Sequence, residues 1–172
     1  MKKIFTLSVI TIFLFASCKK NNPTSAYQIT AAVNGKAKNF NINASASKST
    51  NGFTFISILG FASASTGENF SISIDNGLSG DSIVVGSYTD TTTGFTVSGG
   101  HTIDANTAYE AGTILASNAS NTGTALVNHF KLTITYIDNK SIRGTFSGDF
   151  YSNGDIAAAK ESVTSGNFNV KF

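Results

Sequence analysis

Short runs in which apolar and polar residues alternate recur along almost the whole chain. Over residues 69–75, Phe70, Ile72 and Ile74 alternate with polar neighbours. A period of two places successive side chains on opposite faces of a β-strand, so these runs predict strands with one buried and one wet face. Serine, threonine and asparagine supply 22, 21 and 17 of the 172 residues, which leaves few strong helix formers. An all-helical fold is therefore excluded.

The strand-like runs predict a single all-β domain. They span residues 27–33, 37–44, 53–62, 69–75, 82–89, 95–98, 108–115, 129–137, 141–151 and 167–172. About ten short strands separated by turn residues are typical of an antiparallel β-sandwich or a flattened barrel, and a lipocalin-like barrel is the alternative. The run 53–61 is apolar on both faces, which predicts a central strand covered on each side, or one that lines an interior. One helical turn is expected, over residues 155–161.

Two hairpin registers follow from the requirement that partner side chains share a face. The Asn-Gly pair at positions 34–35 favours a two-residue type I′ turn. That turn predicts Ile29 opposite Phe40, and Tyr27 opposite Ile42.

For the second hairpin, a three-residue loop over 138–140 pairs apolar residues with each other, whereas a two-residue loop pairs them with polar ones. The three-residue loop predicts Leu132 opposite Phe146. It also predicts that His129 and Asp149 form a surface pair.

The first eighteen residues predict an export signal that ends in a lipid anchor. Two lysines follow Met1, the segment 4–15 is largely apolar, and two small residues precede Cys18, the only cysteine. The apolar segment is too short to span a membrane and has the length of a signal-peptide core. The alternative is an ordinary secretory peptide that happens to contain a cysteine.

The resulting organisation has three parts: a signal peptide over 1–17, the lipidated Cys18 with a polar tether over 18–25, and one β domain over 26–172. Lys19, next to the lipidated residue, favours transfer to the outer membrane, and the side that the domain faces stays open. From Ser25 onward the chain carries 8 basic and 10 acidic side chains. That balance does not favour nucleic-acid binding through a basic face.

Both ends of the domain resemble a known group of proteins. The segments ITAAVNGKAKNF (29–40), SIRGTFSGDFY (141–151) and VTSGNFNVKF (163–172) are similar to small Bacteroidota-type lipoproteins of unknown function. These share a lipobox, an early VNG hairpin, an I-x-G-T-F strand and a terminal G-x-F-x-V strand. The resemblance implies an antiparallel β domain on an outer membrane, and it supplies no catalytic residue.

Candidate ligand-binding residues gather around one threonine- and glycine-rich segment, 88–101 (YTDTTTGFTVSGGH). We expect a long exposed loop or edge hairpin there, because loops on a rigid sheet often carry binding sites. Tyr88, Phe95 and Tyr109 are candidate stacking surfaces for a sugar, together with His101. The alternative is that these aromatic residues belong to the core.

Catalytic and metal-binding patterns are sparse. His101 lies near Asp104 and Glu110 in the sequence, which allows either a surface metal site or an ordinary turn histidine. The loops 75–81 and 149–155 superficially resemble calcium loops but lack the required ligands, so we interpret them as Asp/Gly turns.

Two further hypotheses concern carboxylates and hydroxyl groups. Asp149, Asp81 and Glu110 would have to converge to hydrolyse a glycoside. The tripeptides Asp81-Ser82-Ile83 and Asp90-Thr91-Thr92 match an O-glycosylation pattern.

The sequence thus predicts a binding or structural module of the cell envelope that is not an enzyme and needs no cofactor or metal. Its predicted partners are the membrane, through the N-terminal lipid, and a glycan or an envelope protein. The alternatives are a lipocalin-like carrier of an apolar ligand and a glycan-directed hydrolase.

Substituting Cys18→Ala removes the sulfur that would carry the lipid. We expect an uncut precursor without acyl label, measured by gel mobility and by incorporation of a labelled fatty acid. Ser17→Ala, which keeps a small residue before the cut, should be processed like the wild type. Mature-size Cys18→Ala protein in the membrane fraction would contradict the prediction.

Overall fold

The computed structural model describes residues 27–77 and 79–172. The predicted signal peptide (1–17), the lipidation of Cys18 and the tether (18–25) therefore lie outside the described residues. In the described part of the chain, no helix has both the length and the apolar character that a membrane crossing requires.

The described residues form eleven strands and one α-helix. The strands are β1 (Gln28–Val33), β2 (Lys36–Asn39), β3 (Ile42–Ser49), β4 (Phe55–Phe61), β5 (Asn69–Asp75), β6 (Gly86–Thr89), β7 (Thr96–Asp104), β8 (Thr107–Gly112), β9 (Lys131–Ile137), β10 (Ser141–Ser152) and β11 (Lys160–Lys171), and the helix is α1 (Thr113–Thr122).

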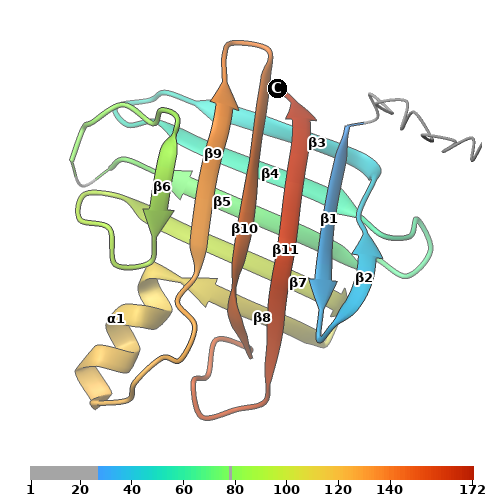
Figure 1. Cartoon of the computed structure of the whole chain (residues 1–172), viewed down its shortest axis with the longest axis vertical. Coiled ribbons are helices and arrows are strands. Elements are labelled where there is room, and N and C mark those ends of the chain that lie inside the picture. Colours follow the sequence, from blue (N-terminus) through green and yellow to red (C-terminus); the bar gives the residue numbers. More distant parts are fainter. Residues whose placement is uncertain (1–26, 78) are drawn as a thin grey trace, which may run out of the picture.

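The strands form one curled antiparallel sheet that folds into two layers. The order is β2-β1-β11-β10-β8-β7-β5-β4-β3, with β9 beside β10 and β6 beside β9. We call the group β6, β9, β10, β11, β1 and β2 layer A, and the group β3, β4, β5, β7 and β8 layer B. Layer A crosses in front of layer B in Figure 1, and α1 lies at one end of both. This half-barrel arrangement confirms the predicted all-β fold of sandwich or flattened-barrel type.

The long strand β10 joins the two layers at one corner. Its first half pairs with β9, whereas Tyr151 and Ser152 at its end pair with β8. At the opposite corner the chain bends at Phe40 and leaves β2 for β3. The predicted single strand 37–44 is therefore wrong, because its two halves belong to different layers. Phe40 is fully buried at this bend, and its N–H donates to the Ile29 carbonyl at 2.7 Å.

The first predicted hairpin is confirmed close to its turn. The ladder between β1 and β2 runs from Val33–Lys36 to Thr30–Asn39, the register that the Asn-Gly turn requires. The expected pair of Tyr27 and Ile42 is wrong, because the bend sends Ile42 to β3, where it pairs with Phe61.

The second hairpin also has the predicted register over most of its length, with Leu132 opposite Phe146. Nearer the turn, one extra residue in β9 shifts the register, so that Arg143 lies opposite Tyr136. The predicted pair of His129 and Asp149 is wrong. The chain before β9 turns toward Asp90 instead, and His129 Nδ1 lies 2.8 Å from Asp90 Oδ1.

Three strand predictions need correction. The segment 88–101 is not a long exposed loop, because β7 is a nine-residue inner strand between β5 and β8. β6 begins at Gly86, four residues later than predicted. β11 begins at Lys160, seven residues earlier, because Glu161 pairs with Phe150 of β10. The inner strand β4, between β3 and β5, agrees with the prediction of a central strand.

The helix forms at a different place from the one predicted. Residues 155–161 form a turn followed by the start of β11, whereas 113–122 are helical instead of continuing a strand. Gly123 ends α1 in the left-handed conformation (φ 71°), where glycine is favoured. The helix buries only Leu115, Ala116 and Ala119. So short an apolar stripe leaves little periodic signal in the sequence.

Phenylalanine rings fill the space between the layers. The Phe70 ring centroid lies 4.8 Å from that of Phe146, 5.3 Å from that of Phe40 and 5.5 Å from that of Phe150. Several rings lie over glycines of neighbouring strands. A Cβ atom on Gly144 would come within 2.5 Å of the Phe168 ring. These glycines make room for the rings, which lie close to the glycine backbone.

Gly144→Ala should lower the free energy of unfolding by about 2 kcal/mol, because the added methyl group overlaps the Phe168 ring and the Thr133 carbonyl. Urea denaturation followed by circular dichroism measures this change. Gly86→Ala is the control, since its Cβ would be 3.8 Å from the nearest atoms of Tyr88, and we expect a change within about 0.5 kcal/mol. Equal stability of both variants would contradict the packing described here.

Candidate functional site

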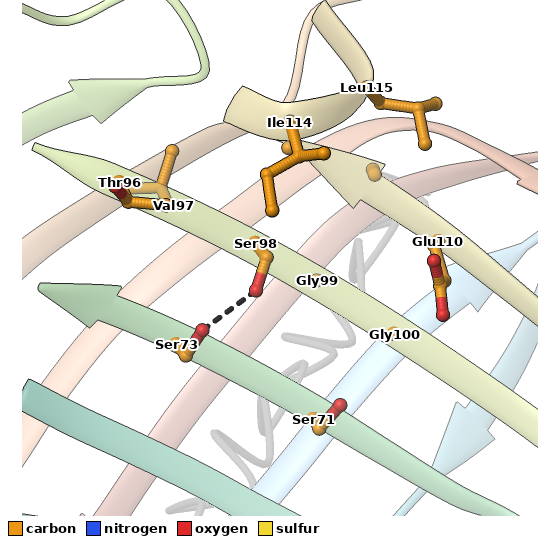
Figure 2. A pocket seen from close by; sticks show the side chains of 12 residues that line it. Ser71, Ser73, Thr96, Val97, Ser98, Gly99, Gly100, Glu110, Ile114 and Leu115 are labelled. Carbon is orange, nitrogen blue, oxygen red and sulfur yellow. Dashed lines mark hydrogen bonds between the residues drawn. The ribbon is translucent and has the colours of Figure 1, made fainter. Parts of the chain in front are cut away.

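A groove of about 410 Å³ lies on the outer face of layer B, where α1 overhangs β7 and β8. Figure 2 shows its floor of small side chains, with Ser71 and Ser73 from β5 and Ser98 from β7. Glu110 of β8 and Ile114 of α1 lie along its sides. The groove therefore combines hydroxyl groups, one carboxylate and an apolar edge.

Strand alternation places the serines on this face. Phe70, Ile72 and Ile74 point into the core, so Ser71 and Ser73 point outward. The register of β5 and β7 then brings the Ser73 and Ser98 hydroxyl oxygens to 2.7 Å. The same row continues across the sheet, with Ser57 of β4 beside Ser73 and Ser47 of β3 beside Ser57. Four strands thus present a line of serine side chains.

The turn from β8 into α1 forms the edge of the groove. Gly112 has a φ of 135°, which other residues rarely adopt, and a Cβ there would lie 2.7 Å from Ser98 Cα. The Val97 N–H donates to the Thr113 hydroxyl at 3.0 Å. Ile114, two residues after Gly112, is 71% exposed beside the groove. An exposed large apolar residue next to polar groups is a common feature of ligand sites.

Glu110 is the charged residue among those that line the groove. It lies between Gly100 of β7 and Tyr151 of β10 in the sheet. Among the ion pairs of the described residues, none involves Glu110. An ionised carboxylate only accepts hydrogen bonds, whereas serine hydroxyls donate and accept. The groove can therefore bind a ligand with several hydroxyl or amino groups.

The four residues predicted to bind a ligand do not line this groove. Tyr88 is 5% exposed, and its hydroxyl donates to the Val84 carbonyl at 2.8 Å. The Tyr88 ring meets Phe95 edge-on, with centroids 4.9 Å apart, and Phe95 is half-buried. Tyr109 is half-buried against the core and pairs with His101. Tyr88, Phe95 and Tyr109 therefore pack as core residues, the alternative considered for the aromatic residues.

His101 forms the centre of a buried polar cluster instead of lying in a turn. Its side chain is fully buried, with Nδ1 2.6 Å from Glu161 Oε2 and Nε2 3.1 Å from Glu68 Oε1. Lys38 Nζ completes the cluster at 2.5 Å from the same Glu68 oxygen. Each ring nitrogen thus faces a carboxylate oxygen, and the imidazole bridges the two glutamates. We call Glu161, His101, Glu68 and Lys38 the histidine cluster.

The histidine cluster links the two layers. Lys38 and Glu161 belong to layer A and His101 to layer B, while Glu68 immediately precedes β5. Burial of Glu68 favours its neutral form, but the hydrogen bonds from Lys38 and His101 outweigh this and lower the pKa of Glu68. Asp104 and Glu110 are not among the partners of His101. Among the described residues, no group of three His, Cys, Asp or Glu side chains is arranged to hold a metal ion.

The other predicted carboxylates have separate contacts. Asp149 Oδ2 accepts hydrogen bonds from Lys160 at 2.7 Å and from Asn128 at 3.2 Å. The hydrogen bond from Lys160 raises the pKa of Lys160. Asp90 Oδ2 accepts the Phe130 N–H at 2.9 Å. Asp81 lies in the loop before β6, where its N–H donates to Ser79.

The predicted turns and modification patterns also have definite places. Asp75 and Asp155 accept backbone N–H groups two residues further on, at 3.0 Å and 2.9 Å, as expected of Asp turns. Asp149 is instead a buried residue of β10. Ser82 and Thr91 of the O-glycosylation patterns are exposed.

The serines of the groove were missed because their importance depends on which strands are neighbours. Alternation alone places Ser71 and Ser73 on an outer face, but it does not reveal that β7 and α1 lie next to them. A usable signal did exist for His101. His101 lies two and four residues after Gly99 and Val97 in one strand, so all three share a face. Because Val97 is apolar, that face is expected to point inward.

Comparison with known proteins finds no matching family model, no matching curated protein and no matching solved structure.

Glu68→Gln should make stability less dependent on acid pH. The pKa of Glu68 is lower in the folded protein than in the unfolded chain, so its contribution is present above about pH 4.3 and is lost as the pH falls through the folded value. We expect a shallower decrease of the unfolding free energy between about pH 5 and about pH 3. Urea titrations at several pH values measure it. Glu110→Gln is the matched control, and identical slopes for wild type and Glu68→Gln would contradict the cluster.

Proposed function

We propose that the protein is a lipid-anchored binding module of the cell envelope, and that the groove beneath α1 binds a hydroxyl-rich ligand of the glycan class. The observation that carries this proposal is the combination of aligned serines with Glu110 and the exposed Ile114 in one groove. The antiparallel β domain supports the module, while the anchor rests on the sequence around Cys18.

The chemistry of a sugar ring fits this groove. A pyranose has a face of C–H groups and a rim of hydroxyl groups, so its ligand site needs both an apolar contact and polar partners. Ile114 supplies the apolar contact, while Ser98 and Glu110 supply the polar ones. Neighbouring strands lie about 4.8 Å apart, so β5, β7 and β8 offer their side chains at regular intervals along a ligand.

We also propose that the protein binds its ligand without converting it. Hydrolysis of a glycosidic bond commonly uses two carboxyl groups placed on either side of that bond. Among the described residues that line the groove, only Glu110 has a carboxyl group. His101 and His129 each face a carboxylate elsewhere in the fold. These contacts favour binding over general acid–base catalysis.

Transport of an apolar ligand has less support. A lipocalin-like carrier needs open space inside its barrel, but the rings around Phe70 occupy the space between the layers.

The proposed lipid on Cys18 would also limit movement of the domain. Eight tether residues, 18–25, reach at most about 28 Å when fully extended. The proposed module therefore works close to the membrane that holds its anchor.

A glycan array tests the proposal, using the full chain purified in a nonionic detergent. Glu110→Gln should weaken binding of the recognised glycan by about tenfold or more, because it removes a charged acceptor. Ile114→Ser should also weaken it, through loss of the apolar contact. Asp104→Asn and Val84→Ser make similar changes at exposed positions outside the groove and should bind normally.

Two results would contradict the proposal. One is full binding by both groove variants. The other is turnover of a glycan on the array that disappears in Glu110→Gln, which would make the protein a hydrolase.

A further inference from the structure

Layer A presents an unbroken row of polar side chains to the outside. One residue from each of its six strands lies in register with the next, in the order Asn39, Thr30, Asn167, Thr145, Thr133 and Ser87. The neighbouring positions in each strand point into the core, as Phe146 and Phe168 do. The row therefore consists of outward-facing residues that alternate with the core residues along each strand.

Three hollows adjoin one another along this face over β9, β10 and β11, which lie side by side in Figure 1. Their volumes are about 500, 270 and 360 Å³. The first and second share Thr145 and Asn167, and the second and third share Lys131 and Ser147. The bulge in β11, where Ser165 has a φ of 51°, lies in its middle part. We call these adjoining hollows the furrow.

Positive side chains line the furrow at intervals. Arg143 lines its first hollow, and Lys131 lines both the second and the third. Lys131 lies opposite Ser147 of β10. Ser147 comes four residues after Arg143, which corresponds to about 13 Å along the strand. A chain-like ligand would meet these cations one after another.

Three carboxylates on or beside layer A are hidden from the furrow. Asp149 and Asp90 have side chains only 1% exposed, and Glu161 points inward to His101. Exposed carboxylates occur in the adjoining turns, at Asp138 and Asp155. The chain as a whole is nearly neutral, but solvent in the furrow meets cations and hydroxyl groups.

From this charge pattern we propose that the furrow binds an anionic polysaccharide that carries carboxylate or sulfate groups. Arg143 and Lys131 pair with the anionic groups, and Thr145, Asn167 and Ser147 bind the sugar hydroxyls. Charge complementarity favours an anion here and disfavours it at the groove, where Glu110 provides the opposite sign. The two sites therefore select different ligands, and the furrow does not depend on the proposed function of the groove.

The shape of the furrow favours a polysaccharide over other polyanions. A lipid bilayer is flat and usually takes up apolar side chains, whereas the large exposed apolar residues near this face, Val127 and Tyr136, lie toward its two ends. Single-stranded nucleic acid binds by stacking on aromatic rings. Tyr136 is the exposed ring here, and the Arg143 guanidinium already lies 5.1 Å from its centroid.

Calorimetry with three probes tests the proposal on the full chain in a nonionic detergent. The probes are polygalacturonate, neutral dextran of similar length and phosphatidylglycerol vesicles. We expect binding of polygalacturonate alone, weakened by added salt because its charges are exposed to solvent. The double variant K131Q/R143Q should lose about tenfold or more in affinity.

The double variant K36Q/K48Q is the matched control, since it removes the same charge from exposed lysines outside the furrow and should bind within about twofold of the wild type. K131Q alone keeps the contact between Arg143 and Tyr136, and it should show part of the loss. Circular dichroism melts confirm that each variant is folded.

Equal losses in K131Q/R143Q and K36Q/K48Q would overturn the proposal, because binding would then follow net charge alone. Binding of vesicles without polygalacturonate would also overturn it, in favour of a membrane-facing surface. Glu110→Gln should bind polygalacturonate like the wild type, so the groove and the furrow can fail independently.

Discussion

The close packing of phenylalanine rings over glycines holds the two layers together, and the outer faces depend on it. Phe130 and Phe150 lie against Gly99, and Phe146 lies against Gly166, so a ring from one strand occupies the place where another strand has no side chain. Large rings would otherwise push neighbouring strands apart. Because the interior is filled this way from inward positions, each strand can devote its outward positions to serine, threonine and asparagine.

The histidine cluster is the polar exception inside this interior, and its position explains how it is tolerated. The His101 ring stacks on Phe70 with centroids 5.9 Å apart, so its faces are in apolar contact while its two nitrogens reach Glu161 and Glu68. A buried charge is costly unless it is paired and hydrogen-bonded. Here both nitrogens have partners, and Lys38 balances the second carboxylate. The cluster therefore adds directional contacts between the two layers at the place where they cross.

Local sequence patterns predicted those parts of the fold that depend only on residues close together in the sequence. Alternation predicted the strand over 69–75, and the Asn-Gly turn at 34–35 was enough for the first register. The bend at Phe40 was missed because the apolar alternation continues across it, and only contacts with distant strands separate β2 from β3. The candidate site was predicted less well. Its serines were visible as outward residues, but the neighbourhood of β5, β7 and α1 is a long-range property of the topology.

Net charge says little about the individual faces of this domain, since the fold distributes its charges unevenly. Folding buries Asp90, Asp149 and Glu161 on or beside layer A, while Arg143 and Lys131 stay at its surface. These three carboxylates are the partners of His129, Lys160 and His101 respectively. A chain with slightly more acidic than basic residues in its domain can in this way present a cationic furrow on one face and an acidic groove on another. Separating charge by burial gives one small β domain two surfaces of opposite charge.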